Sequence, residues 1–137
     1  MGNRRKSREC ALQILYQRDF SSAEHRFVSE NYWNEAGIDE ETKVFALELI
    51  NGVDRCREEL DAIIARHSEN WKLQRMAAVD KNILRIATYE LLHCPDIPMK
   101  VTINEAIEIA RRFGTEQSSS FINGVLDHVA QEVKKGE

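Results

Sequence analysis

The stretch VDKNILRIATYELLHCPDIP, residues 79–98, carries the clearest fold signal in the sequence. Apolar side chains recur at Ile83, Leu84, Ala87 and Leu91, the spacing that places them on one face of a helix. We expect this helix to begin near residues 79–80 and to end at HCPDIP, because proline interrupts helical hydrogen bonding. The stretch therefore predicts a strongly apolar helix followed by a two-proline linker.

Three further helical patterns precede it, over about residues 7–20, 24–36 and 44–64. Gly37 is placed to end the second in the left-handed conformation. The acids at 39–41 favour the start of the third because they complement the helix dipole. Gly52 lies inside that third helix, where we expect it to bend or weaken the helix.

Two helical patterns follow the linker. Thr102 with Glu105 three residues later predicts a capping box at the start of a helix that Gly114 closes. The last helix, over about residues 118–133, has an apolar arc that leaves Phe121 just outside its edge. Gly124 and His128 share the angular sector of Phe121. Helix-on-helix packing explains Gly124 most simply, and close approach of a ligand is the alternative.

Length and composition predict one all-α domain. The chain has 137 residues, 42% of them hydrophobic and 31% charged, with only 6 Gly and 2 Pro. We read a bundle of six or seven helices. Three cysteines without a C-x-x-C spacing fit reduced thiols in the cytoplasm, and neither a signal peptide nor a membrane-spanning run is visible. The expected setting is a soluble cytoplasmic protein with no membrane partner.

The usual motifs of catalysis and of cofactor or metal binding are missing. No glycine-rich phosphate loop or hydrolase motif occurs. His93 and Cys94 are adjacent, but neighbours on a helix point about 100° apart, and no third group orients the histidine. His25, His67 and His128 share no ligand spacing. We therefore expect no enzyme, no cofactor and no metal.

The basic N-terminus stands out against this background. Arg4, Arg5, Lys6 and Arg8 lie within five positions, and residues 1–20 carry +3 in a chain whose net charge is −4. Cations at a helix N-terminus oppose the dipole by about 0.3–1 kcal/mol each. Two interpretations remain open: a disordered solubilising tail, or an arginine-rich arm that orders on RNA by gripping phosphates.

Arithmetic limits what such an arm can do alone. If all four cations neutralise phosphates of single-stranded RNA, the log-log salt slope is about −2.8, a loss of about fiftyfold between 50 and 200 mM salt. A stacking surface or a partner protein would have to supply the remaining affinity.

Four motifs together resemble the NusB family of transcription antitermination and ribosomal RNA synthesis factors. They are RRKSRECALQILYQ at 4–17, VDKNILRIATYELL at 79–92, PMKVTINEAIEIARRFG at 98–114 and SSFINGVLD at 119–127. The resemblance extends over nearly the whole chain and is weakest at 21–75. It implies an all-helical fold of two three-helix subdomains with a linking helix. Here the N-terminal half covers about 1–75, with a flexible basic arm at 1–7, and the C-terminal half covers about 76–137.

The same resemblance implies partners and roles. Proteins of this family bind the boxA element of nascent ribosomal RNA leader transcripts together with the ribosomal protein NusE, and help RNA polymerase, with other Nus factors, to read through terminators. The implied RNA-binding residues are Arg4, Arg5, Lys6, Arg8, Gln117 and Phe121, and the implied NusE contacts are Tyr16 and Asp80. Some members resemble homodimers, so the sequence fits a monomer or a homodimer.

Three positions depart from the family pattern. Asp80 replaces the usual glutamate, Ser120 stands where many members have a basic residue, and Gln117 stands where an acid is common. Asp80 is also explained simply as a first-turn acid. Two other functions remain open: the RNA-binding domain of a ribosomal RNA cytosine methyltransferase, which the short ending KKGE argues against, and a helical adaptor that binds only protein.

Overall fold

The computed structural model describes residues 3–20, 32–33, 37–68 and 73–136. These residues form five long α-helices and a short 3-10 helix, η1 (Leu73–Arg75), and contain no strand. The α-helices are α1 (Arg4–Phe20), α3 (Glu40–Arg66), α4 (Ala78–His93), α5 (Met99–Phe113) and α6 (Ser118–Lys135). The all-α prediction is confirmed. Most of the helix expected over 24–36 lies outside the described residues.

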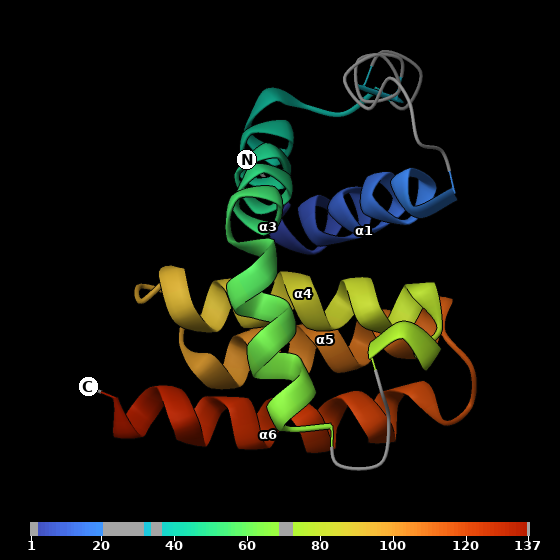
Figure 1. The fold of residues 1–137 in the computed structure, drawn as a ribbon. Coiled ribbons are helices and arrows are strands. Elements are labelled where there is room, and N and C mark those ends of the chain that lie inside the picture. The colour runs from blue at the N-terminus through green and yellow to red at the C-terminus, as the bar shows by residue number, and fades with distance from the viewer. Residues whose placement is uncertain (1–2, 21–31, 34–36, 69–72, 137) are drawn as a thin grey trace.

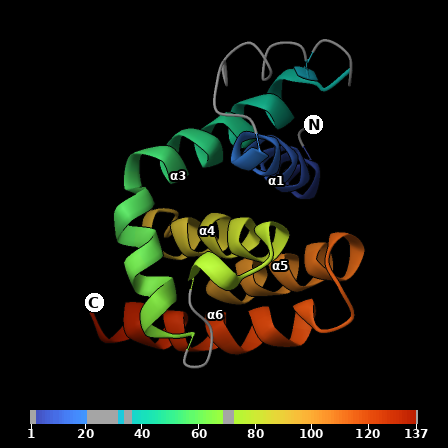
Figure 2. The same ribbon diagram turned by 45° about the vertical axis from the view of Figure 1, so that its right-hand side comes forward.

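The helices are stacked in layers (Figure 1). α4, α5 and α6 pack against one another as a group of three helices, and α1 lies on the other side of α4. α3 crosses the stack: its first half lies beside α1 and its second half runs past α4 to α6 (Figure 2). α3 links this group of three helices to α1.

α4 is buried on nearly every side, as its apolar sequence predicts. All residues from 82 to 91 are buried, including Ile83, Leu84, Ala87 and Leu91. A helix surrounded in this way must also satisfy its polar side chains, because an unpaired buried charge is costly. Three of its buried polar residues accordingly bind partners on neighbouring helices: Asn82 binds Asp19, Arg85 binds Asp61 and Glu90 binds Arg8.

Gly52 explains how α3 packs on α4. A Cβ atom at this position would overlap the ring of Tyr89, which is buried at 4% exposure. The missing side chain therefore lets the Tyr89 ring lie directly on the backbone of α3. Figure 2 shows that α3 also changes direction along its length.

α1 begins at Arg4, three residues before the expected start, so residues 4–7 are helical and do not form a flexible arm. Asn3 explains the earlier start. Its Oδ1 accepts a hydrogen bond from the Lys6 N–H at 3.0 Å, and its own N–H donates to Thr42 Oγ1 at 3.0 Å. Ser7 is also buried, and its hydroxyl donates to the Thr42 carbonyl at 2.7 Å. The first turn is thus tied to α3.

The predicted capping box of α5 was wrong. The helix begins at Met99, with Pro98 as the preceding cap residue and no side-chain cap. Thr102 and Glu105 instead point toward α1 and α4: Thr102 donates to Glu90 Oε1 at 3.1 Å, and Glu105 accepts from Arg5. A hydrogen bond from Thr102 and an ion pair of Glu105 to other helices thus use the two side chains that the local pattern assigned to the cap. Gly114 does end the helix, as predicted.

Among the described residues, no helix combines the length and apolar character needed to cross a membrane.

Candidate nucleic-acid interface

Three of the four N-terminal cations lie at the surface of α1. Arg4 and Arg5 are exposed, and Lys6 is half-buried. Arg5 forms a bidentate contact with Glu105 of α5, with Nε 2.9 Å from Oε1 and Nη2 2.6 Å from Oε2. This contact holds the pKa of Glu105 below its ordinary value. The Arg4 guanidinium lies 4.5 Å from the centre of the Phe45 ring.

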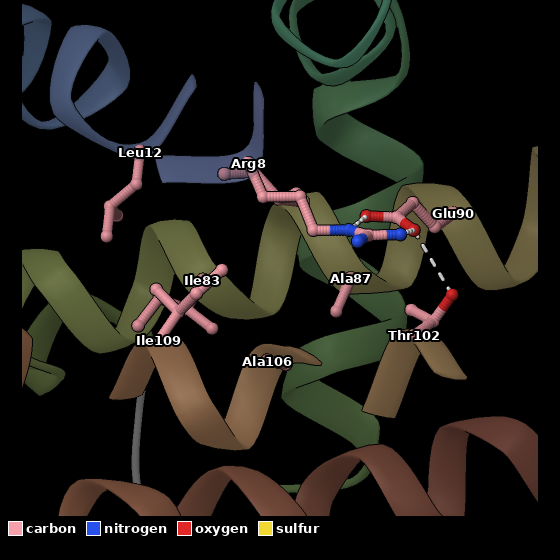
Figure 3. A pocket seen from close by; sticks show the side chains of 9 residues that line it. Arg8, Leu12, Ile83, Ala87, Glu90, Thr102, Ala106 and Ile109 are labelled. Atoms are coloured by element: carbon pink, nitrogen blue, oxygen red, sulfur yellow. Dashed lines mark hydrogen bonds and ion pairs between the residues drawn. The ribbon is translucent and has the colours of Figure 1, made fainter. Parts of the chain in front are cut away.

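Arg8 differs from the other three because its side chain is only 5% exposed. Its Nε lies 2.8 Å from Glu90 Oε2 and its Nη2 lies 2.7 Å from Glu90 Oε1, while Thr102 donates to the same carboxylate (Figure 3). Glu90 is 1% exposed. RNA phosphate cannot reach a guanidinium that is enclosed and paired in this way, so Arg8 stabilises the contact between α1, α4 and α5.

The space around this ion pair is part of the core. Its lining combines the ion pair with apolar side chains of α1, α4 and α5, among them Leu12, Ile83 and Ile109 (Figure 3). The free volume is about 10 Å³, roughly the room for one water molecule. It is therefore an interior gap and not a ligand pocket.

α5 contributes two cations that sequence reasoning missed, Arg111 and Arg112. Together with Arg5 they line a surface hollow between α1 and α5. Arg112 Nη1 lies 2.9 Å from Glu9 of α1, and Arg111 Nη1 lies 2.6 Å from Glu108. The pair sits in the last turn of α5, where the helix dipole already explains basic residues. Nothing in the local sequence pointed to a contact with α1.

Gln117 and Phe121 lie at the start of α6, on a different part of the surface. Gln117 is exposed, and Phe121 is half-buried beside Gly124 and His128 in a hollow of about 260 Å³. A Cβ atom at Gly124 would meet nothing within 4 Å, so helix packing does not explain this glycine. Phe121, Gly124 and His128 share one open sector, as the helical periodicity predicts.

The end of α3 completes this hollow. His67 lies across from His128, with ring centres 6.1 Å apart and ring planes 3° from parallel. His67 Nε2 lies 2.7 Å from Glu132 Oε1, and Arg66 binds the same carboxylate. The hollow thus has one wall on α3 and one on α6, and the Glu132 contacts hold the two together.

The two groups of residues implied to bind RNA are not adjacent. α1 and α6 lie on opposite sides of the α4 and α5 layers (Figure 1). The end of α5 connects them along the surface, because Arg112 contacts Glu9 of α1 and Gln117 follows five residues later. The Ser118 hydroxyl accepts the Thr115 N–H at 2.9 Å and fixes the turn between α5 and α6.

Tyr16 and Asp80 lie at one end of the α1–α4 pair. Tyr16 is 39% exposed and Asp80 is half-buried. Asp19, near the end of α1, accepts a hydrogen bond from Asn82, near the start of α4, at 2.8 Å, so the two helices meet here. Oδ1 of Asp80 is buried and has no hydrogen-bond partner among the described residues.

The adjacent His93 and Cys94 do not form a nucleophilic pair. Cys94 is buried, and burial together with Glu48 raises the pKa of its thiol to about 12. A thiol with that pKa stays protonated at neutral pH. His93 is exposed and turns instead toward Glu59 and Cys56 of α3.

Comparison with known proteins identifies a family that matches nearly the whole chain, including the surfaces described above. The family model described as "NusB family" matches residues 5–131, which include α1, α3, α4, α5 and most of α6. The chain belongs to the NusB family.

Individual NusB proteins support this membership. The transcription antitermination protein NusB of Myxococcus xanthus is 47% identical over 98% of this chain and 99% of its own length. The solved T. maritima NusB is 42% identical, with a TM-score of 0.88 over 96% of this chain and 94% of that one. The Myxococcus protein is named for transcription antitermination, a function that involves no catalysed reaction, in agreement with the prediction that the chain is not an enzyme.

The fold also matches a more distant solved assembly. A crystal structure of the antitermination factors NusB and NusE in complex with dsRNA contains a chain that is 23% identical to this one. The TM-score is 0.85, over 94% of this chain and 96% of that one. At this identity the likeness concerns the fold.

Proposed function

We propose that this protein is a bacterial transcription antitermination factor that binds boxA RNA of nascent ribosomal RNA leader transcripts together with NusE. Through other Nus factors it would support read-through by RNA polymerase and ribosomal RNA synthesis. The observation that carries the proposal is a series of surface groups, which we call the RNA path. It consists of the exposed cations of α1 (Arg4, Arg5 and Lys6), the basic end of α5 (Arg111 and Arg112) and the hollow beside Phe121 at the start of α6.

The cations at the beginning of this path suit phosphate. Arg4, Arg5 and Lys6 lie on the outer side of α1, and Arg111 and Arg112 extend the basic character across α5. Acids of α1 and α5 pair with several of these groups, so an incoming phosphate would have to replace a carboxylate such as Glu105. Such an exchange gives moderate affinity, in keeping with the need for a partner.

Phe121 suits a base at the other end of the path. Its ring borders a hollow that Gly124 leaves open, with His128 on the same wall and His67 on the opposite one. Aromatic side chains that stack on unpaired bases contribute about 1–3 kcal/mol per base. The neutral Gln117 avoids the repulsion that an acid would impose on RNA at this point.

Asp80 and Tyr16 suit a protein partner. Burial of a carboxylate oxygen without a hydrogen-bond donor is unfavourable, and a donor from NusE would remove that cost. The exposed part of the Tyr16 ring lies at the same end of the α1–α4 pair. This surface is distinct from the RNA path, so RNA and NusE can bind together.

Salt-dependent RNA binding tests the proposal. With Arg8 buried, three cations remain in the first turn of α1, and they contribute a log-log slope of about −2.1, or about twentyfold between 50 and 200 mM salt. Changing Arg5 and Lys6 to Ala should reduce the slope by about 1.4 for boxA RNA. The matched control changes Lys134 and Lys135 to Ala, which removes the same charge at the far end of α6 and should leave the slope unchanged.

Two comparisons separate this function from its alternatives. Scrambled RNA should bind more weakly than boxA RNA, and equal affinity for both would refute specific recognition. Adding NusE should strengthen boxA binding, and Asp80→Asn should reduce that gain while Glu116→Gln, an exposed acid elsewhere, should not. A protein-only adaptor would bind NusE with no response to RNA.

A further inference from the structure

A group of three potential metal ligands lies between α3 and α4, away from the RNA path. Cys56 and Glu59 are three residues apart on α3 and therefore share a helix face. His93 is the last residue of α4, and its ring points to both of them. The ligand atoms of the three side chains all lie within 4.8 Å of one another. Periodicity along one helix could not reveal this group, because its members come from two.

The distances match those of a tetrahedral zinc site. Zn²⁺ bound about 2.3 Å from sulfur and about 2.0 Å from nitrogen or oxygen separates sulfur from nitrogen by about 3.6 Å, and nitrogen from oxygen by about 3.3 Å. His93 Nε2 lies 3.8 Å from Cys56 Sγ and 3.3 Å from Glu59 Oε1. Two of the three distances between the ligand atoms therefore already suit a tetrahedral site, and the third, from Cys56 Sγ to the Glu59 carboxylate, is within 4.8 Å.

We propose that Cys56, Glu59 and His93 form a Zn²⁺ site in which water supplies the fourth ligand. A thiolate, an imidazole and a carboxylate are the ligand types that zinc prefers, whereas Mg²⁺ and Ca²⁺ prefer oxygen alone. Cys56 is half-buried, and the side chains of Glu59 and His93 are 54% and 40% exposed. The open side leaves room for the water, and binding releases the Cys56 proton to solvent.

The packing between α3 and α4 holds the histidine in position. The Tyr89 ring lies one turn before His93, and the two ring centres are 5.1 Å apart. Tyr89 is itself seated against Gly52, one turn before Cys56 on α3. The contact that packs the two helices thus also orients the ligands, as supporting groups do in metal sites.

The cluster is more than an ion pair at the surface. A contact between an exposed histidine and an exposed glutamate contributes little to stability by itself. The Cys56 thiol lies next to the same imidazole nitrogen. A thiol contributes nothing to an ion pair between histidine and glutamate, but it is a preferred ligand of zinc. His93 also lies thirteen residues after Asp80, about 20 Å along α4, so the metal would sit far from the proposed NusE surface.

Cobalt spectroscopy tests the site directly. Protein without an affinity tag is titrated with Co²⁺, and thiolate-to-cobalt charge transfer is followed in the near ultraviolet. The expected result is a saturable band at one equivalent that Zn²⁺ displaces and Mg²⁺ does not. Cys10 and Cys94 are buried, so the band should require Cys56. Absence of a band would overturn the proposal.

Variants locate the ligands. Cys56→Ser, with Cys56→Ala as a second version, should abolish the band, and a band that persists would overturn the assignment. Glu59→Gln and His93→Gln should each weaken Zn²⁺ binding by more than about tenfold. Glu58→Gln and His128→Gln are matched controls on other surfaces and should leave it unchanged. Zinc should raise the Tm of the wild type but not of His93→Gln; unchanged affinity in both Glu59→Gln and His93→Gln would refute the site.

Discussion

Arg5 and Arg8 lie about one turn apart on α1, and each guanidinium binds both carboxylate oxygens of a glutamate. The Arg5–Glu105 pair is exposed, with side chains 52% and 17% accessible, whereas the Arg8–Glu90 pair is buried, at 5% and 1%. The same contact thus occurs once outside and once inside. The two contacts have the same geometry, so it is burial that decides whether the cation can bind a ligand, as for Arg5, or only stabilises the fold, as for Arg8.

The cost of removing one partner differs between these settings. At the surface, water replaces a lost partner, so a single pair contributes about 0–1 kcal/mol. Inside, the remaining charge has no water and its desolvation is uncompensated. Arg8 therefore belongs to the architecture even though it stands in the same basic stretch as Arg4, Arg5 and Lys6.

The largest expected effect comes from breaking the inner pair. Arg8→Met should lower the free energy of unfolding by about 3–5 kcal/mol, because the buried Glu90 carboxyl group loses its ion-pair partner. Arg5→Met, the matched change in the outer pair, should cost less than about 1 kcal/mol. Urea unfolding of both variants measures the difference. Arg8→Met combined with Glu90→Leu should recover part of the loss, and equal costs for the two single variants would contradict the comparison.

A second contrast between inside and outside concerns two glycines within helices. Gly52→Ala should destabilise the protein by about 1–3 kcal/mol, because the new methyl group would overlap the Tyr89 ring. Gly124→Ala should stabilise α6 by up to about 1 kcal/mol, because nothing lies near the added carbon and alanine favours helix. Thermal unfolding measures both. Destabilisation by Gly124→Ala would mean that its sector is not open.

Periodicity predicted the elements well because it reports which faces are apolar. It gave the apolar character of α4, the end of α5 at Gly114 and the shared sector of Phe121, Gly124 and His128. Each of these depends on the order of residues within one helix. Local sequence is sufficient for such features.

Features that depend on a neighbouring helix were missed for a physical reason. Thr102 and Glu105 have the spacing of a capping box, but the helix begins earlier, at Met99, and the two side chains bind Glu90 and Arg5 instead. The burial of Arg8 depends on Glu90, 82 positions away. The zinc ligands likewise combine α3 with α4. A single sequence does not show which side chains on separate helices face each other.

The smallest expected effect is the pH dependence of the outer pair. The hydrogen bonds from Arg5 lower the pKa of Glu105 in the folded state below its ordinary value of 4.5. A carboxylate with a lowered folded pKa stabilises the protein above its unfolded pKa, and this contribution is lost as the pH falls through the folded pKa. Because Arg5 is largely exposed, solvent screening limits the contribution to less than about 1 kcal/mol. Glu105→Gln should therefore be less stable than the wild type at neutral pH, and the gap should close as the pH falls below about 4.5.

Urea unfolding of the wild type and Glu105→Gln across this pH range measures that gap. Glu108→Gln is the matched control, since Glu108 lies on the same helix and binds the exposed Arg111. A gap that stays constant with pH would mean that the Glu105 charge contributes nothing. Added salt should shrink the gap, because screening weakens an exposed pair more than a buried one. If salt did not change the gap, the Arg5–Glu105 pair would be shielded from solvent like the buried Arg8–Glu90 pair.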